Sequence, residues 1–110
     1  MEINIKIMQD VVVIEMSGDI DSNSAPAAQQ KVMSEGVKPG AKVILEMSRV
    51  GYMSSAGLRM LLYIYRQMAS SGGSVGIVGL SEDIQDTMSL TGFLGFFKLY
   101  PTLNEALASI

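Results

Sequence analysis

The stretch VILEMSRVGYMSSAGLRMLL, residues 43–62, contains a strand, a loop and the start of a helix in direct succession. Its first three residues are consecutive and apolar, which is typical of a strand that is covered on both faces. From Leu58 to Ala69, apolar residues recur at helical spacing. The glycine- and serine-containing loop at 47–57 therefore follows a buried strand, where open α/β sheets place their functional sites.

The segments on either side continue an alternation of strands and helices. The apolar runs Ile3–Met8 and Val11–Met16 are separated by two residues and predict an antiparallel hairpin. The remaining predicted elements are a helix after Ser24 that runs towards Gly36, a strand at Val75–Val78, a helix capped by Ser81 that ends near Gly92, a strand at Phe96–Tyr100, and a short helix opened by Thr102 and Glu105. This order predicts one α/β domain over residues 1–110, with a mostly parallel sheet, an N-terminal antiparallel strand and four helices.

Composition excludes several classes of site. The 110 residues include no cysteine and no histidine, which rules out disulfides, cysteine or histidine metal ligands and Ser-His-Asp triads. The net charge of −3 disfavours nucleic-acid binding, because that affinity depends on Lys and Arg neutralising phosphates. The N-terminus has no secretory pattern, and the apolar-leaning stretch 58–69 is too short to span a bilayer. We therefore expect a cytoplasmic protein that binds neither nucleic acid nor a membrane.

Two apolar features are predicted to belong to the core. The chain has nine methionines, which usually fill gaps in a core, although Met53 and Met60 flank the serine loop and could form part of a binding surface. The run Phe93–Phe97 is predicted to be a buried loop and strand rather than an exposed patch.

Ser54 and Ser55 precede the helix that starts near Leu58, where backbone N–H groups lack partners. The residues alone favour a structural role, in which one serine caps the helix and the other is solvated. The alternative is phosphorylation. A helix N-terminus tolerates a phosphate, whereas a partner docked over the same point would have to bury its charge. For Asp19 and Asp21, the residues alone favour a turn in which the side chains bond to the local backbone.

Residues 43–62 and the loop GDIDSNSAP, residues 18–26, together resemble the signature of the anti-sigma-factor antagonists, the stand-alone STAS-domain proteins. The length and the order of elements resemble that family over essentially the whole chain. The resemblance implies that Ser55 is phosphorylated by the partner protein, an anti-sigma factor that is a serine kinase. Many members have Asp where this chain has Ser54, which leaves Ser54 as a competing site. The partner surface implied by the resemblance consists of Asp21, Ser22, Asn23, Ser24, Met53, Ser54, Ala56, Gly57, Leu58 and Arg59.

The resemblance also implies a function. The unphosphorylated chain would bind an anti-sigma factor that is a serine kinase and free its sigma factor, and phosphorylation of Ser55 would end that binding. A serine phosphatase would restore the active form. The kinase binds the ATP, so the chain itself is expected to need no cofactor and to catalyse no reaction. The resemblance also suggests a monomer.

Two alternatives remain. Similar domains serve as STAS subunits of lipid-transport or larger signalling complexes without a phosphorylation cycle. A small enzyme with a serine nucleophile is the least favoured, because without histidine a lysine would have to act as the base.

Overall fold

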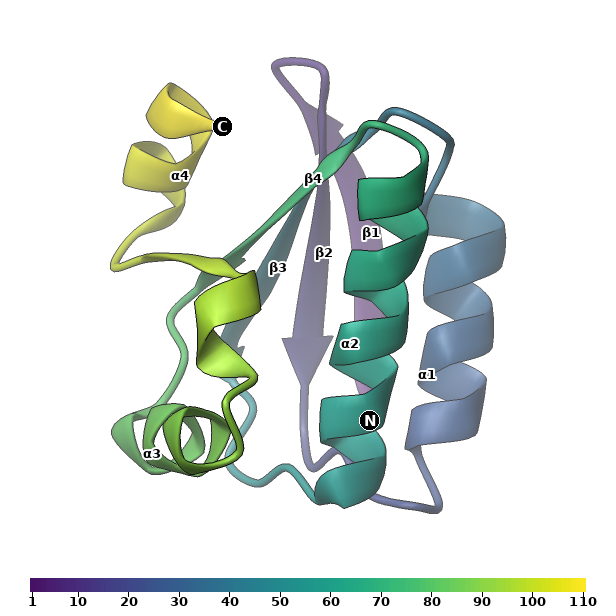
Figure 1. Cartoon of the computed structure of the whole chain (residues 1–110). Coiled ribbons are helices and arrows are strands. Elements are labelled where there is room, and N and C mark those ends of the chain that lie inside the picture. Colours follow the sequence, from purple (N-terminus) through teal and green to yellow (C-terminus); the bar gives the residue numbers. More distant parts are fainter.

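A computed structural model describes all of residues 1–110 and contains a five-stranded sheet in the order β1-β2-β3-β4-β5. The predicted order of strands and helices is confirmed (Figure 1). The elements are β1 Glu2–Met8, β2 Val11–Ser17, α1 Ala25–Lys31, the π-helical turn η1 Val32–Gly36, β3 Lys42–Arg49, α2 Ser55–Ser70, β4 Ser74–Val78, α3 Glu82–Leu90, the 3-10 turn η2 Leu94–Phe96, β5 Lys98–Tyr100 and α4 Leu103–Ser109.

The sheet begins with the predicted hairpin and is parallel from β2 onward. Gln9 and Asp10 form the two-residue turn, with φ angles of 52° and 65°. Positive φ at both positions matches the right-handed twist of the paired strands. The parallel strands β2 and β3 end side by side, where Ser17 pairs with Arg49. The loops that follow these two strands therefore leave the sheet at the same edge.

Helices cover both faces of the sheet, so the central strands are buried on each side. Successive residues of β3 alternate between two apolar clusters: Val43 and Leu45 belong to the larger one, and Ile44 to the smaller one. The larger cluster includes residues of α1, α2 and α3, and the smaller one includes Ala106 of α4. Figure 1 shows α1 and α2 lying next to each other on one face of the sheet. This packing explains why β3 reads as a continuous apolar run.

Two details differ from the sequence predictions. Met53 and Met60, which could have formed part of a binding surface, are only 8% and 1% exposed, so most of each side chain packs in the core. The strand predicted at Phe96–Tyr100 is limited to Lys98–Tyr100, because the N–H groups of Phe96 and Phe97 donate to the carbonyls three residues earlier and form the 3-10 turn η2. Phe97 is buried as predicted, but Phe96 is 47% exposed. Its ring packs 5.3 Å from that of Tyr65, centroid to centroid, on the surface of the domain.

Candidate functional site

The loops after β2 and β3 are held together by backbone hydrogen bonds. The N–H of Ile20 donates to the carbonyl of Tyr52 (2.9 Å), and the N–H of Ser54 donates to the carbonyl of Ile20 (2.8 Å). Ile20 and Met53 thus form an isolated parallel bridge, and Ile20 is fully buried. The two loops consequently form one continuous surface, with Asp21–Ser24 on one side and Ser54–Ser55 on the other.

Gly57 lets α2 begin directly against this bridge. A Cβ atom at this position would overlap the side chain of Met53 and would lie 2.9 Å from Cγ2 of Ile20. No larger residue fits without moving one of these two buried side chains. The absence of a side chain at Gly57 therefore sets how closely the first turn of α2 approaches the loops.

The two serines at the start of α2 have different environments. Ser54 is the N-cap: it has extended backbone angles, and its Oγ accepts the N–H of Ala56 at 3.2 Å. Ser55 is the first residue of the helix and is exposed. The predicted structural role, one capping and one solvated serine, describes this arrangement. It leaves the Ser55 hydroxyl at the surface, beside the N–H groups of the first helical turn.

Asp21 organises the neighbouring loop. Its Oδ1 accepts the N–H groups of Asn23 (2.9 Å) and Ser24 (3.0 Å). These bonds, that of Ser24 first and that of Asn23 second, hold the pKa of the Asp21 carboxyl below its usual value, because they stabilise the charged form. The predicted turn is thus confirmed for Asp21. It is wrong for the carboxylate of Asp19, because only the Asp19 carbonyl takes part, accepting from Oγ of Ser24 at 2.8 Å.

The residues predicted to contact a partner fall into three groups by exposure. Exposed positions are Ser22, Asn23, Ser55 and Arg59; half-buried positions are Asp21, Ser24, Ser54 and Ala56; buried positions are Met53, Gly57 and Leu58. The buried residues lie behind the surface and support it. All eleven come from the two joined loops and the first turns of α2.

Sequence reasoning did not single out several residues of this surface. Tyr52 is 54% exposed on the same loop as Ser54. A shallow groove between α1 and α2 continues the surface and is lined by Ser22, Ala25, Pro26, Gln29, Ala56, Arg59, Met60 and Tyr63. The sequence gives only a weak indication of this groove, because the groove exists only where α1 and α2 are neighbours. The site therefore presents a solvent-exposed hydroxyl with a groove beside it.

No helix of the structure is both long and apolar enough to cross a membrane.

Comparison with known proteins adds to this geometry. A family profile described as the STAS domain matches residues 2–106. An anti-sigma-B factor antagonist of Bacillus subtilis is 29% identical over 94 residues, which cover 84% of this chain and 85% of that protein. The crystal structure of an anti-sigma factor antagonist from Mycobacterium paratuberculosis is 29% identical, with a TM-score of 0.87, covering 99% of this chain and 92% of that one.

More distant structures share the fold alone. The Bacillus anti-sigma factor antagonist SpoIIAA in its unphosphorylated form is 18% identical with a TM-score of 0.78, covering 96% of this chain and 93% of that one. Its structure in the phosphorylated form is 17% identical with a TM-score of 0.70, covering 97% of each chain.

Proposed function

The chain belongs to the STAS domain family, and from that premise we propose that it is an anti-sigma factor antagonist regulated by phosphorylation of Ser55. In its unphosphorylated form it binds an anti-sigma factor and releases the sigma factor which that protein holds. The relatives with identities near 29% carry the name of this role.

The exposed hydroxyl of Ser55 at the start of α2 is the observation that supports the proposal best. A partner that covers the joined loops covers this hydroxyl too. Ser54 is the weaker candidate, because it is half-buried and its oxygen already caps the helix. SpoIIAA, which shares the fold, has been solved in a phosphorylated form, so the fold accommodates such a group.

The chemistry of the switch belongs to the partner. The anti-sigma factor acts as a serine kinase: Oγ of Ser55 bonds to the γ-phosphorus of ATP, the bond to ADP breaks, and the hydroxyl proton is released. A serine phosphatase removes the phosphate by hydrolysis. The chain itself is then a binding module of the cytoplasm that holds no cofactor and catalyses no reaction.

The effect of the phosphate follows from its charge. It adds about −1.5 to −2 charges and three acceptor oxygens. At the N-terminus of α2 the helix dipole and free N–H groups favour this charge, so the domain stays folded. A docked partner must instead desolvate the phosphate. A penalty of about 3 kcal/mol at that contact weakens binding more than about a hundredfold.

The test uses a candidate anti-sigma factor from the same organism, together with its sigma factor. We expect the unphosphorylated chain to displace the sigma factor in size-exclusion chromatography, and ATP to reverse this. The Ser55→Ala variant should keep the complex after ATP is added, whereas the matched Ser54→Ala variant should lose it. Dissociation of the Ser55→Ala complex after ATP is added would contradict the role of Ser55. Binding to a transporter subunit in place of any anti-sigma factor would favour a structural STAS subunit.

A further inference from the structure

Charge is distributed unevenly over this acidic chain. It has 11 acidic and 8 basic residues, yet α1 and α2 contain no Asp or Glu at all. The same two helices contain Lys31, Arg59 and Arg66. The η1 turn that continues α1 adds one exposed carboxylate, that of Glu35. Because α1 and α2 lie next to each other on one face of the sheet, the helical layer of this face carries three cations and one anion on a molecule whose net charge is −3.

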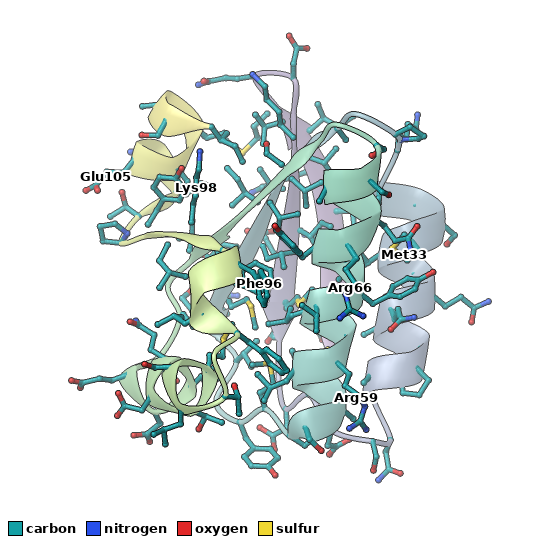
Figure 2. The ribbon with its side chains drawn as sticks, viewed as in Figure 1. Met33, Arg59, Arg66, Phe96, Lys98 and Glu105 are labelled. Carbon is teal, nitrogen blue, oxygen red and sulfur yellow. The ribbon has the colours of Figure 1, made fainter.

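The two arginines are the free cations of this face. Nζ of Lys31 donates to the carbonyl of Ile3 (3.0 Å) and is turned towards β1. Arg59 and Arg66 are exposed and form no ion pair; the single ion pair of the domain joins Lys6 and Glu15. Figure 2 shows both arginine side chains on the front of α2, beside α1.

Between the arginines lies an exposed aromatic residue. Tyr63 is 41% exposed, four residues after Arg59 and three before Arg66, so the three side chains follow one face of α2. Arg59 and Tyr63 also line the groove between the helices. Arginine and tyrosine are among the residue types that most often dominate binding energy at protein interfaces.

We infer that this Arg59–Tyr63–Arg66 stripe and the adjoining groove extend the partner surface beyond the serine loop and bind an acidic segment of the anti-sigma factor. The inference rests on the proposed function and adds to it the chemistry of the partner. Two observations support it: the unpaired arginines on a face with few carboxylates, and continuity with the loops, since Ser22 and Ala56 line the same groove. A guanidinium group binds a carboxylate through two parallel hydrogen bonds, which suits this pairing.

Arg59 also links this surface to the switch. Ser55 and Arg59 are four residues apart on α2, a spacing that brings side chains together, and the order of anion before cation is the favourable one. A phosphate on Ser55 therefore competes with the carboxylate of the partner for the Arg59 guanidinium. Phosphorylation would then both introduce repulsion and withdraw one of the two cations that hold the partner.

The binding test compares variants of the unphosphorylated full chain by calorimetry with the anti-sigma factor. We expect Arg59→Gln and Arg66→Gln each to weaken binding about fivefold or more, and to reduce its dependence on salt. Lys98→Gln is the matched control, because Lys98 is exposed on β5 away from this face (Figure 2) and its loss changes the net charge equally. Circular dichroism would verify that all variants fold.

A second measurement tests the shared role of Arg59 without any partner. Phosphoserine is introduced at position 55 by codon suppression, and the titration of its phosphate is followed by phosphorus NMR. The midpoint should be lower in the wild-type background than with Arg59→Gln, while Arg66→Gln leaves it unchanged. Equal midpoints in all three would overturn the competition for Arg59.

The outcomes separate this inference from the proposed function. A wild-type chain that binds no anti-sigma factor would remove both. If the wild-type chain binds, and neither Arg59→Gln nor Arg66→Gln changes the affinity, only the binding of an acidic segment is contradicted. Equal weakening by Lys98→Gln would also overturn it, because the effect would then come from net charge.

Discussion

Replacing Gly57 with alanine tests whether the close approach of α2 to the Ile20–Met53 bridge holds the site together. The added Cβ would overlap the Met53 side chain and lie 2.9 Å from Cγ2 of Ile20. Neither neighbour moves easily. Ile20 is fully buried and is held by two backbone hydrogen bonds, and Met53 is 8% exposed.

Two effects of this substitution oppose each other. Overpacking a well-filled core costs about 1–3 kcal/mol, and this contact belongs at the upper end because two buried side chains must move. Alanine in place of glycine favours a helix by at most about 1 kcal/mol, and less in its first turn. Overpacking therefore prevails, and we expect Gly57→Ala to lower the free energy of unfolding by about 2 kcal/mol.

Urea unfolding followed by circular dichroism measures this change. Gly95→Ala is the matched control, because a Cβ there meets no atom within 4 Å, and it should leave stability within about 0.5 kcal/mol of wild type. Met53→Ala should cost less in the Gly57→Ala background than alone, since it relieves the overlap. A Gly57→Ala variant as stable as wild type, or two substitutions whose effects simply add, would show that the added Cβ does not overpack this contact.

Three further predictions concern the same loops. Ser54→Ala should lower the free energy of unfolding by about 1 kcal/mol by removing the cap of α2, whereas Ser54→Asp should retain it; equal thermal stability of the two would contradict the capping role. The pKa of Asp21 is depressed in the folded state, so its contribution to stability is present above the unfolded pKa of about 3.9 and is lost as the pH falls through the native pKa. Acid unfolding of Asp21→Asn should accordingly depend less on pH below about 4, and an unchanged acid profile would argue against these bonds. Ser55→Asp should leave the melting temperature equal or higher, because an acidic residue suits the first helical turn, while it abolishes binding to the anti-sigma factor; a loss of fold would contradict the exposed position of Ser55.

Much of the fold could be predicted from local patterns. The apolar run at Val43–Leu45 indicated a strand buried on both faces, and its residues do divide between two apolar clusters. The hairpin followed from two β-rich runs separated by two residues. In contrast, the strand predicted at Phe96–Tyr100 is longer than the observed β5. The residue types of Phe96 and Phe97 fit a strand as well as they fit a 3-10 turn, and here their N–H groups are bonded within the turn.

The candidate site also contains some residues that local patterns could predict and others that they could not. The serines and Asp21 could be identified because caps and turns depend on neighbours in the sequence. The Ile20–Met53 bridge joins loops from two different strands, and the groove joins two helices. Such contacts depend on how elements pack, so no local pattern in the sequence identifies Ile20, Tyr63 or Arg66 as part of the site. The burial of Met53 has the same origin, since its place under Gly57 is set by the bridge.

Identifying the modified residue tests the phosphorylation switch most directly. The full chain is incubated with the anti-sigma factor and ATP and then analysed by intact-protein and peptide mass spectrometry. We expect a single phosphate on Ser55 that is absent from Ser55→Ala and present in Ser54→Ala. A phosphate on Ser54, or none from a kinase that is active on ATP and binds this chain, would contradict it.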